Sequence, residues 1–210
     1  MTLTELRIRL RRDLHDEDPA QYRWSDATLD RHVQHALREV SLAVPLEGVA
    51  TLTTTAGSRD LSLAGLADLV SVEAAEYPVN RYPPCFVPFS LWEATLTLLV
   101  DAPPQGVEDV KVYYGRLHTL DDQGSTLPAY LEELVLAGAA GYAALEWANF
   151  AANRVNVGGV EVWRRYLAWG EVRLAQFHRG LARVGRRSAL RVRRLYASAR
   201  PAPSRPGLGG

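Results

Sequence analysis

Two histidines in the segment HVQH are the first residues whose type and spacing could do chemistry. His32 and His35 lie three residues apart, and on a helix this spacing places both imidazoles on one face. Such a pair could hold a metal ion if a third ligand arrived from elsewhere in the chain. No cysteine pair or His-Glu pattern accompanies them, so two exposed or partly buried helix histidines are the simpler interpretation. We therefore predict no metal site.

The other groups capable of catalysis stand alone in the sequence. Paired carboxylates, which are common on loops and in first helical turns, occur at Asp121-Asp122, at Glu132-Glu133 and from Asp16 to Asp18. The Gly pair in VNVGGVE precedes a helical pattern but lacks the lysine of a phosphate-binding loop and the GxGxxG spacing. Cys85 has no activating base nearby and is predicted to be a small buried or semi-buried thiol. The sequence therefore predicts neither an enzyme nor a cofactor site.

Helical periodicity dominates the first 45 residues. Thr2 and Glu5 have the spacing of a capping box, which predicts a first helix over about residues 3–14. Ser25 is the predicted N-cap of a second helix, and Pro45 follows its end. We expect these two helices to form an amino-terminal pair.

Two further helices are predicted in the second half of the chain. Pro128 suits the first turn of a third helix that runs to about Ala152. Its central Ala and Gly residues have little side-chain volume, so a neighbouring helix can approach closely. A fourth helix is predicted from about Val160 to Val184, and the two should pair as a hairpin.

Between the helical parts, from residue 46 to about residue 120, the period of the sequence changes to two. Short β-branched or alternating segments are separated by clusters of Gly, Pro and Asn. These segments are VATLTTT, RDLSL, LVSVEAAEY, EATLTLLV and VKVYYGRL. They predict about five antiparallel strands in a small inserted β-domain.

Charge is distributed unevenly along a chain whose formal net charge is zero. No acidic residue follows Glu171, whereas residues 172–210 contain ten arginines. Residues 1–171 therefore hold 24 acidic against 14 basic side chains, a formal charge of −10. The pattern predicts an acidic body with a basic carboxyl-terminal segment.

The helical pattern weakens after Gly185. LRVRRLY, residues 190–196, alternates as an edge strand would, with Leu190, Val192 and Tyr196 on one side. The last ten residues, PAPSRPGLGG, are rich in Pro and Gly and are predicted to be flexible when free.

Composition restricts the class of protein and its compartment. A chain of 210 residues with 47% apolar content can bury a sizeable core. The single cysteine cannot form an internal disulfide, and MTLTELRIRLRRDL lacks the apolar run of a signal peptide. The most apolar stretch, residues 134–148, is too short for a bilayer and contains Glu146. We expect an intracellular protein that does not contact a membrane.

Together these patterns predict an α+β fold: a four-helix core, an antiparallel β-domain inserted between helices two and three, and an extended carboxyl-terminal arm. The predicted divisions are a helical pair over residues 1–45, the β-domain over 46–122, a helical hairpin over 123–185 and a flexible basic arm over 186–210. The hairpin is expected to pack on the amino-terminal pair.

Two short motifs open the second and third predicted helices. WSD at residues 24–26 is followed by Leu29 and Ala36, and TLP stands at residues 126–128. In this order, with the β-domain between them, they resemble the head-tail connector, or adaptor, proteins of tailed bacteriophages. The likeness spans roughly residues 1–187. The β-domain is longer here than in the smallest members of that family.

The resemblance implies a structural protein of the virion neck, without catalysis. Such adaptors form a homo-oligomeric ring, typically twelvefold, beneath the portal of the filled capsid. The ring extends the DNA channel and offers a surface to the next tail or stopper protein. Its partners are then the portal protein, neighbouring copies, that downstream protein and DNA passing nonspecifically through the channel, and assembly takes place in the host cytoplasm.

In such adaptors the carboxyl-terminal segment reaches up and docks on the portal. On this chain the resemblance assigns docking to the basic arm, with the residues Arg186, Arg187, Leu190, Arg191, Val192, Arg193, Arg194, Leu195 and Tyr196. The arginines could meet an acidic portal surface, and LRVRRLY could add a strand to an exposed portal edge.

Two other functions remain open from the sequence. A nonspecific nucleic-acid-binding protein using the Arg-rich arm is the alternative, because ten arginines without an acid attract phosphate. No helix-turn-helix, zinc or RNA-binding aromatic signature supports a dedicated DNA-binding module. The third is an enzyme, either a muralytic adaptor or a metal hydrolase using His32 and His35.

Overall fold

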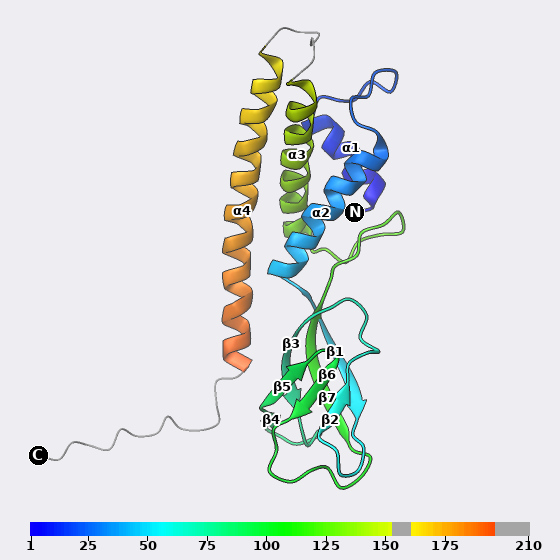
Figure 1. Cartoon of the computed structure of the whole chain (residues 1–210), viewed down its shortest axis with the longest axis vertical. Helices are drawn as coiled ribbons and strands as arrows, with labels where there is room; N and C mark the ends of the chain where they lie inside the picture. The colour runs from blue at the N-terminus through cyan, green and yellow to red at the C-terminus, as the bar shows by residue number, and fades with distance from the viewer. Residues whose placement is uncertain (153–160, 196–210) are drawn as a thin grey trace, which may run out of the picture. The chain divides into compact units, whose positions relative to one another are not determined.

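The computed structural model describes the backbone of residues 1–152 and 161–195 and the side chains as far as residue 188 (Figure 1). The helices are α1 (Leu3–Asp13), α2 (Asp26–Ala43), α3 (Ala129–Ala151) and α4 (Val162–Leu195). The strands are β1 (Leu46–Thr53), β2 (Asp60–Ser62), β3 (Leu69–Glu76), β4 (Phe86–Val87), β5 (Phe89–Trp92), β6 (Thr95–Leu98) and β7 (Asp109–Arg116). All strands lie between α2 and α3 in the chain, which confirms the predicted α+β class.

The chain divides into two compact units. The helical unit comprises Met1–Gly48, Ala67–Ser71 and Gly115–Arg186, and the strands are mainly carried by Val49–Leu66 and Val72–Tyr114 in the β-unit. All four helices contribute to one apolar core in the helical unit. Burial of this core is the main force that holds the helices together.

Local capping chemistry sets the starts of the first two helices. The Thr2 hydroxyl accepts a hydrogen bond from the Glu5 N–H at 3.2 Å, and the Glu5 carboxylate accepts one from the Thr2 N–H at 2.8 Å. The Ser25 hydroxyl accepts from the Thr28 N–H at 3.1 Å and caps α2. These bonds satisfy N–H groups that have no partner within the helix, so both predicted N-caps are confirmed.

Glycines let α3 and α4 approach each other closely, as the small residues of α3 predict (Figure 1). A Cβ atom placed on Gly141 would lie 2.7 Å from Cγ of Leu174, a distance that no real side chain tolerates. Further along the helices, Gly180 lies against Leu134. The two pairs run in opposite directions along the chain, so the helices are antiparallel and form the predicted hairpin.

The strands form two sheets. A four-stranded sheet has the order β1-β7-β3-β4, and a three-stranded sheet has the order β2-β6-β5. β6 pairs antiparallel with both β2 and β5, in a register that places Leu96 opposite Leu61 and Leu91. The five predicted strands are present, and β4 and β5 are additional ones on either side of Pro88.

Three connecting loops of the β-unit are tied together at Glu108. Its carboxylate accepts hydrogen bonds from the Tyr77 hydroxyl at 2.8 Å and the Gln105 N–H at 3.0 Å. Its backbone exchanges bonds with Thr54, whose N–H donates to the Glu108 carbonyl at 2.8 Å. The Tyr77 hydrogen bond lowers the pKa of the Glu108 carboxyl. One residue thus joins the loop after β1, the loop after β3 and the loop before β7.

Candidate functional site

The segment predicted to be a docking arm begins inside α4. This helix continues past Gly185 to Leu195, so residues 186–195 have a helical backbone and the predicted edge strand is wrong. Arg, Leu and Ala favour helix, and no proline interrupts the segment before Pro201. The eight predicted docking residues from Arg186 to Leu195 therefore lie on α4, whereas Tyr196 lies outside the described residues.

The apolar side of α4 holds it on the helical unit. Phe177 is fully buried, and Leu174, Leu181 and Val184 pack partly buried against the core. These residues recur every three or four positions, which is one face of a helix. The core contacts of α4 thus extend to Val184, just before the predicted docking residues.

The opposite side of α4 carries a row of arginines. Arg179, Arg183 and Arg186 are exposed and stand at positions i, i+4 and i+7. At 3.6 residues per turn they lie on the side away from Phe177, and we call them the arginine face. The predicted docking residues include only Arg186 of this group. The helical spacing of arginines along the polar side was the signal that could have found the other two.

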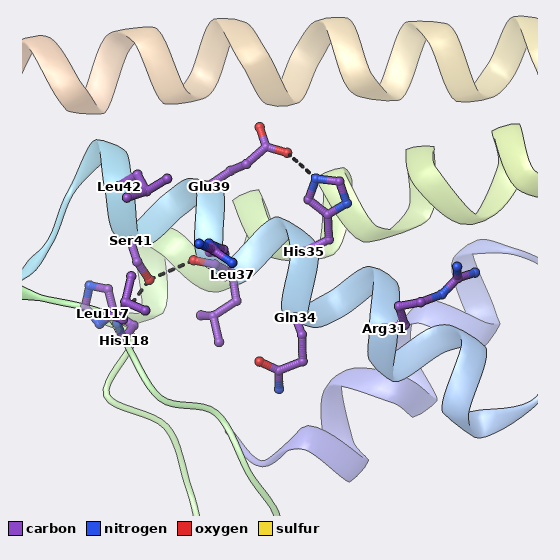
Figure 2. A pocket seen from close by; sticks show the side chains of 10 residues that line it. Arg31, Gln34, His35, Leu37, Glu39, Ser41, Leu42, Leu117 and His118 are labelled. Carbon is purple, nitrogen blue, oxygen red and sulfur yellow. Dashed lines mark hydrogen bonds and ion pairs between the residues drawn. The ribbon is translucent and has the colours of Figure 1, made fainter. Parts of the chain in front are cut away.

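An open hollow of about 720 Å³ lies beside the second half of α2 (Figure 2). Most of its lining comes from α2, and Leu117 and His118 complete it. The Ser41 hydroxyl donates to the Leu37 carbonyl at 2.7 Å and accepts from the His118 N–H at 3.0 Å. The hydroxyl therefore bonds to the backbone of α2 and to that of the segment before α3.

Glu39, at the edge of this hollow, joins three helices. Its carboxylate accepts a hydrogen bond from the Tyr142 hydroxyl of α3 and lies 3.8 Å from Nε2 of His178 on α4. Nε2 of His35, one turn earlier on α2, lies 3.2 Å from the same carboxylate (Figure 2). The His35 ring stacks on the Tyr142 ring with centroids 4.4 Å apart. Burial, with the Glu39 hydrogen bond as the smaller cause, raises the pKa of Tyr142.

The two histidines of HVQH have different carboxylate partners. His32 is buried and contacts Glu146 of α3, which also pairs with Arg31 at 2.5 Å, whereas His35 faces Glu39. Burial lowers the pKa of His32 in spite of the Glu146 hydrogen bond. Within the described residues, no three His, Cys, Asp or Glu side chains are gathered in a way that could hold a metal ion.

His118 is a second buried histidine of the helical unit. Its Nδ1 lies 3.2 Å from the Thr126 carbonyl oxygen and its Nε2 lies 3.1 Å from the Val44 carbonyl oxygen. Burial lowers the pKa of this imidazole, and the two carbonyls oppose that shift only partly. The folded protein therefore favours the neutral form of His118, as it does for His32.

We expect the free energy of unfolding to fall as the pH drops from about 7 to about 5. A histidine whose pKa is lower in the folded state binds its proton more readily when unfolded, so its contribution is present above the unfolded pKa of about 6.5 and lost below it. Urea unfolding across this range measures the effect. The free energy of unfolding of His118→Gln should fall less than that of the wild type. The control variant His15→Asn, at an exposed position, should show the wild-type fall. An unchanged fall in His118→Gln would contradict the assignment.

The remaining chemical candidates have structural partners. Asp121 accepts from the N–H groups of Gln123 and Gly124 at 2.8 and 3.0 Å. Asp122 accepts from the Thr4 hydroxyl at 2.7 Å, and Glu132 and Glu133 pair with the amino terminus and Arg9. Cys85 is exposed, so its predicted burial is wrong; it follows two prolines in a surface loop of the β-unit. The Gly pair of VNVGGVE lies outside the described residues.

The WSD motif at the start of α2 is part of the packing of the helical unit. The Trp24 indole N–H donates to the Ala143 carbonyl of α3 at 3.1 Å, and Ser25 is the N-cap. Asp26 accepts from the Arg11 guanidinium of α1 at 2.7 Å, and this hydrogen bond lowers the pKa of the Asp26 carboxyl. The three residues thus connect α1, α2 and α3.

The TLP motif has the same kind of role at the start of α3. The Thr126 hydroxyl accepts from the Thr119 N–H at 2.9 Å, Leu127 is buried in the core and Pro128 is the N-cap. Pro128 therefore stands one position before the predicted first turn. Both motifs contribute to the capping and packing of the helical unit.

Among the described helices, none is both long and apolar enough to cross a bilayer. No curated protein matches the chain. Two solved structures that resemble it are chains of the "Neck of empty GTA particle computed with C6 symmetry" and the "Neck of native GTA particle computed with C12 symmetry". Their sequences are 17% and 18% identical to this chain, and the TM-scores are 0.29 and 0.28. Each alignment covers 80% of this chain, and the alignments cover 88% and 89% of the two neck chains.

The family comparison covers almost the whole chain. Residues 1–202 match the family model described as SU10 adaptor protein, which includes both short motifs, the β-domain and α4. A match of this extent confirms the resemblance to phage head-tail adaptors that the WSD and TLP motifs indicate. The chain belongs to the SU10 adaptor protein family.

Proposed function

We propose that this head-tail adaptor forms a homo-oligomeric ring beneath the portal, extends the DNA channel and connects the capsid to a downstream tail or stopper protein. Residues 186–210 dock on the portal. The ring is assembled in the host cytoplasm and becomes part of the virion neck. Twelve copies are the number that the family resemblance implies.

The observation that carries this proposal is the separation of charge along the chain. Residues 1–171 have a formal charge of −10, whereas residues 172–210 contain ten arginines and no acid. A closed ring needs two different, complementary faces on each subunit. An acidic body and a basic end supply that complementarity between neighbouring copies, and the basic end also suits an acidic portal surface.

The length of α4 supports docking by its carboxyl-terminal end. The core contacts of the helix extend to Val184, and the helical backbone continues to Leu195. Residues 185–195 are therefore carried by a helix whose earlier part is anchored in the core. A helix presented in this way can dock with little loss of conformational entropy. We accordingly propose docking by a helical extension of α4 in place of strand addition.

The proposed role needs no catalytic step. The side chains that could do chemistry have other tasks in the helical unit: Ser41 bonds to the backbone, His32 to Glu146, and Asp121 to its own turn. These contacts support a structural role.

A truncation tests the docking proposal. Removal of residues 186–210 should leave a folded protein, because every α4 residue of the core precedes residue 185. This variant is expected to lose binding to the purified portal protein of the same phage, measured by cosedimentation. Its circular dichroism spectrum should lose only the helical signal of residues 186–195, and its thermal unfolding should remain cooperative. The matched control ends at residue 200, retains all nine predicted docking residues and should still bind. Undiminished portal binding by the shorter variant would overturn the docking assignment.

A further inference from the structure

The arginine face of α4 is a second basic surface, and most of it lies outside the proposed docking segment. Arg179 and Arg183 precede residue 186 and project from a part of α4 whose other side is anchored in the core through Phe177 and Leu181. Their positions are therefore set by the folded helical unit and do not depend on a portal.

The charge of this face is not neutralised within the described part of the chain. The ion pairs of the described residues include none made by Arg179, Arg183 or Arg186. The Arg186 guanidinium donates only to the Ala182 carbonyl of its own helix, at 3.1 Å. By contrast Arg164, near the start of α4, is paired with Glu161 at 2.8 Å. Within the described residues, the same helix thus carries an ion-paired arginine, Arg164, near its start and three arginines without an ion pair further along.

The spacing and composition of the face favour phosphate over a protein surface. Seven residues separate Arg179 from Arg186, which is about 10 Å along the helix axis. A duplex presents about six phosphates over that length. Protein interfaces are organised around buried apolar or aromatic anchors. In the described part of α4 the only strongly exposed large apolar side chain is Val172, outside this row.

We propose that the arginine face, Arg179, Arg183 and Arg186, binds the phosphate backbone of duplex DNA without sequence preference. Guanidinium groups bind phosphate oxygens through two parallel hydrogen bonds, so three unpaired arginines on one helical side form a suitable surface. Contacts to the phosphate backbone carry no sequence information and weaken as the salt concentration rises. The inference does not depend on portal docking by residues 186–210.

Fluorescence anisotropy of the full chain with labelled duplexes of unrelated sequence tests the proposal. The test variant is Arg179→Gln/Arg183→Gln, which leaves the docking segment intact. The control variant is Arg12→Gln/Arg164→Gln, which removes the same charge from exposed arginines paired with Glu17 and Glu161. Wild type and control should bind all duplexes with the same salt dependence. The test variant should bind more weakly, with a slope of log affinity against log salt reduced by about 2 between roughly 50 and 200 mM.

The outcomes separate this proposal from its alternatives. Equal losses in the test and control variants would show that total charge, and not the arginine face, attracts DNA, and would overturn the proposal. Unchanged DNA binding by the test variant would also overturn it, and loss of portal binding in that case would assign the face to a protein. Retained portal binding together with reduced DNA binding is the expected result. If the truncation of residues 186–210 does not affect portal binding, the docking proposal fails, but the DNA-binding proposal for the arginine face still stands.

Discussion

Replacing Arg11 with methionine is expected to lower the free energy of unfolding by about 3–5 kcal/mol, the cost of breaking a buried ion pair by removing one partner. Nη1 of Arg11 lies 2.5 Å from the Asp16 carboxylate, and the two side chains are 6% and 3% exposed. Without the guanidinium, the hydrogen-bond partner that Asp16 keeps among the described residues is the Arg23 N–H, at 2.7 Å. Methionine can occupy similar space but cannot compensate the buried negative charge. Urea unfolding followed by circular dichroism measures the loss.

Two further variants make the cause of that loss testable. Arg12→Met removes the neighbouring arginine, which is 67% exposed and lies 3.4 Å from Glu17, and should change the stability by no more than about 0.5 kcal/mol. Arg11→Met combined with Asp16→Asn should recover part of the loss, because the amide is neutral and its oxygen can still accept from Arg23. A single Arg11→Met variant within about 1 kcal/mol of wild type would rule out the ion pair as a major contributor.

The second large effect is expected from Phe177→Ala, which should cost about 3–5 kcal/mol of unfolding free energy. Phe177 is fully buried on α4 and lies over Gly138 of α3, where an added Cβ would be 3.0 Å from the ring. The glycine provides the space that the ring fills. Removing the ring leaves a cavity between the two helices that their backbones cannot close without moving α4.

Val172→Ala is the matched control for this prediction. Val172 lies on the same helix and is 56% exposed, so its truncation should cost no more than about 0.5 kcal/mol. Thermal unfolding and urea unfolding should both show a larger loss of stability for Phe177→Ala than for Val172→Ala. A loss below about 1 kcal/mol in Phe177→Ala would mean that α4 contributes little to the core, contrary to its burial.

The parts of the fold that follow from local chemistry were predictable from the sequence. The N-caps at Thr2 and Ser25 depend on side chains within three residues of the helix start, so their spacing reveals them. The α3–α4 hairpin could be predicted because the Ala and Gly residues of α3 leave space for a neighbouring helix. The order of helices and strands led to the correct family.

The errors arose where one sequence pattern fits two structures. LRVRRLY alternates as a strand does, but its residues also have good helix propensity, and the helix continues through it to Leu195. Pro88 divides FVPFSLW, so β4 and β5 were too short to be recognised beside it. Cys85 follows two prolines in a surface loop, where its type gave no signal of exposure.

Contacts between residues that are far apart in the sequence could not be predicted from local sequence patterns. Glu39 and Tyr142 meet although 103 residues separate them, and Trp24 reaches a carbonyl 119 residues away. The sequence does not distinguish the ion-paired arginine of α4 from the unpaired ones. The folded helix shows that Arg164 pairs with Glu161 and that Arg179 lies on the side away from Phe177. Composition shows how many charges the chain has, and packing decides which of them are available.

The loops joined at Glu108 have a consequence for association. Flexible loops lose conformational freedom when a partner binds them, and that loss subtracts from the affinity. In this β-unit the loops around Thr54, Tyr77 and Gln105 are already restrained by hydrogen bonds to one residue. A protein that binds there meets a surface whose ordering was completed when the chain folded. Recognition at that end of the β-unit would then be limited by the fit of the surfaces and not by the entropy of the loops.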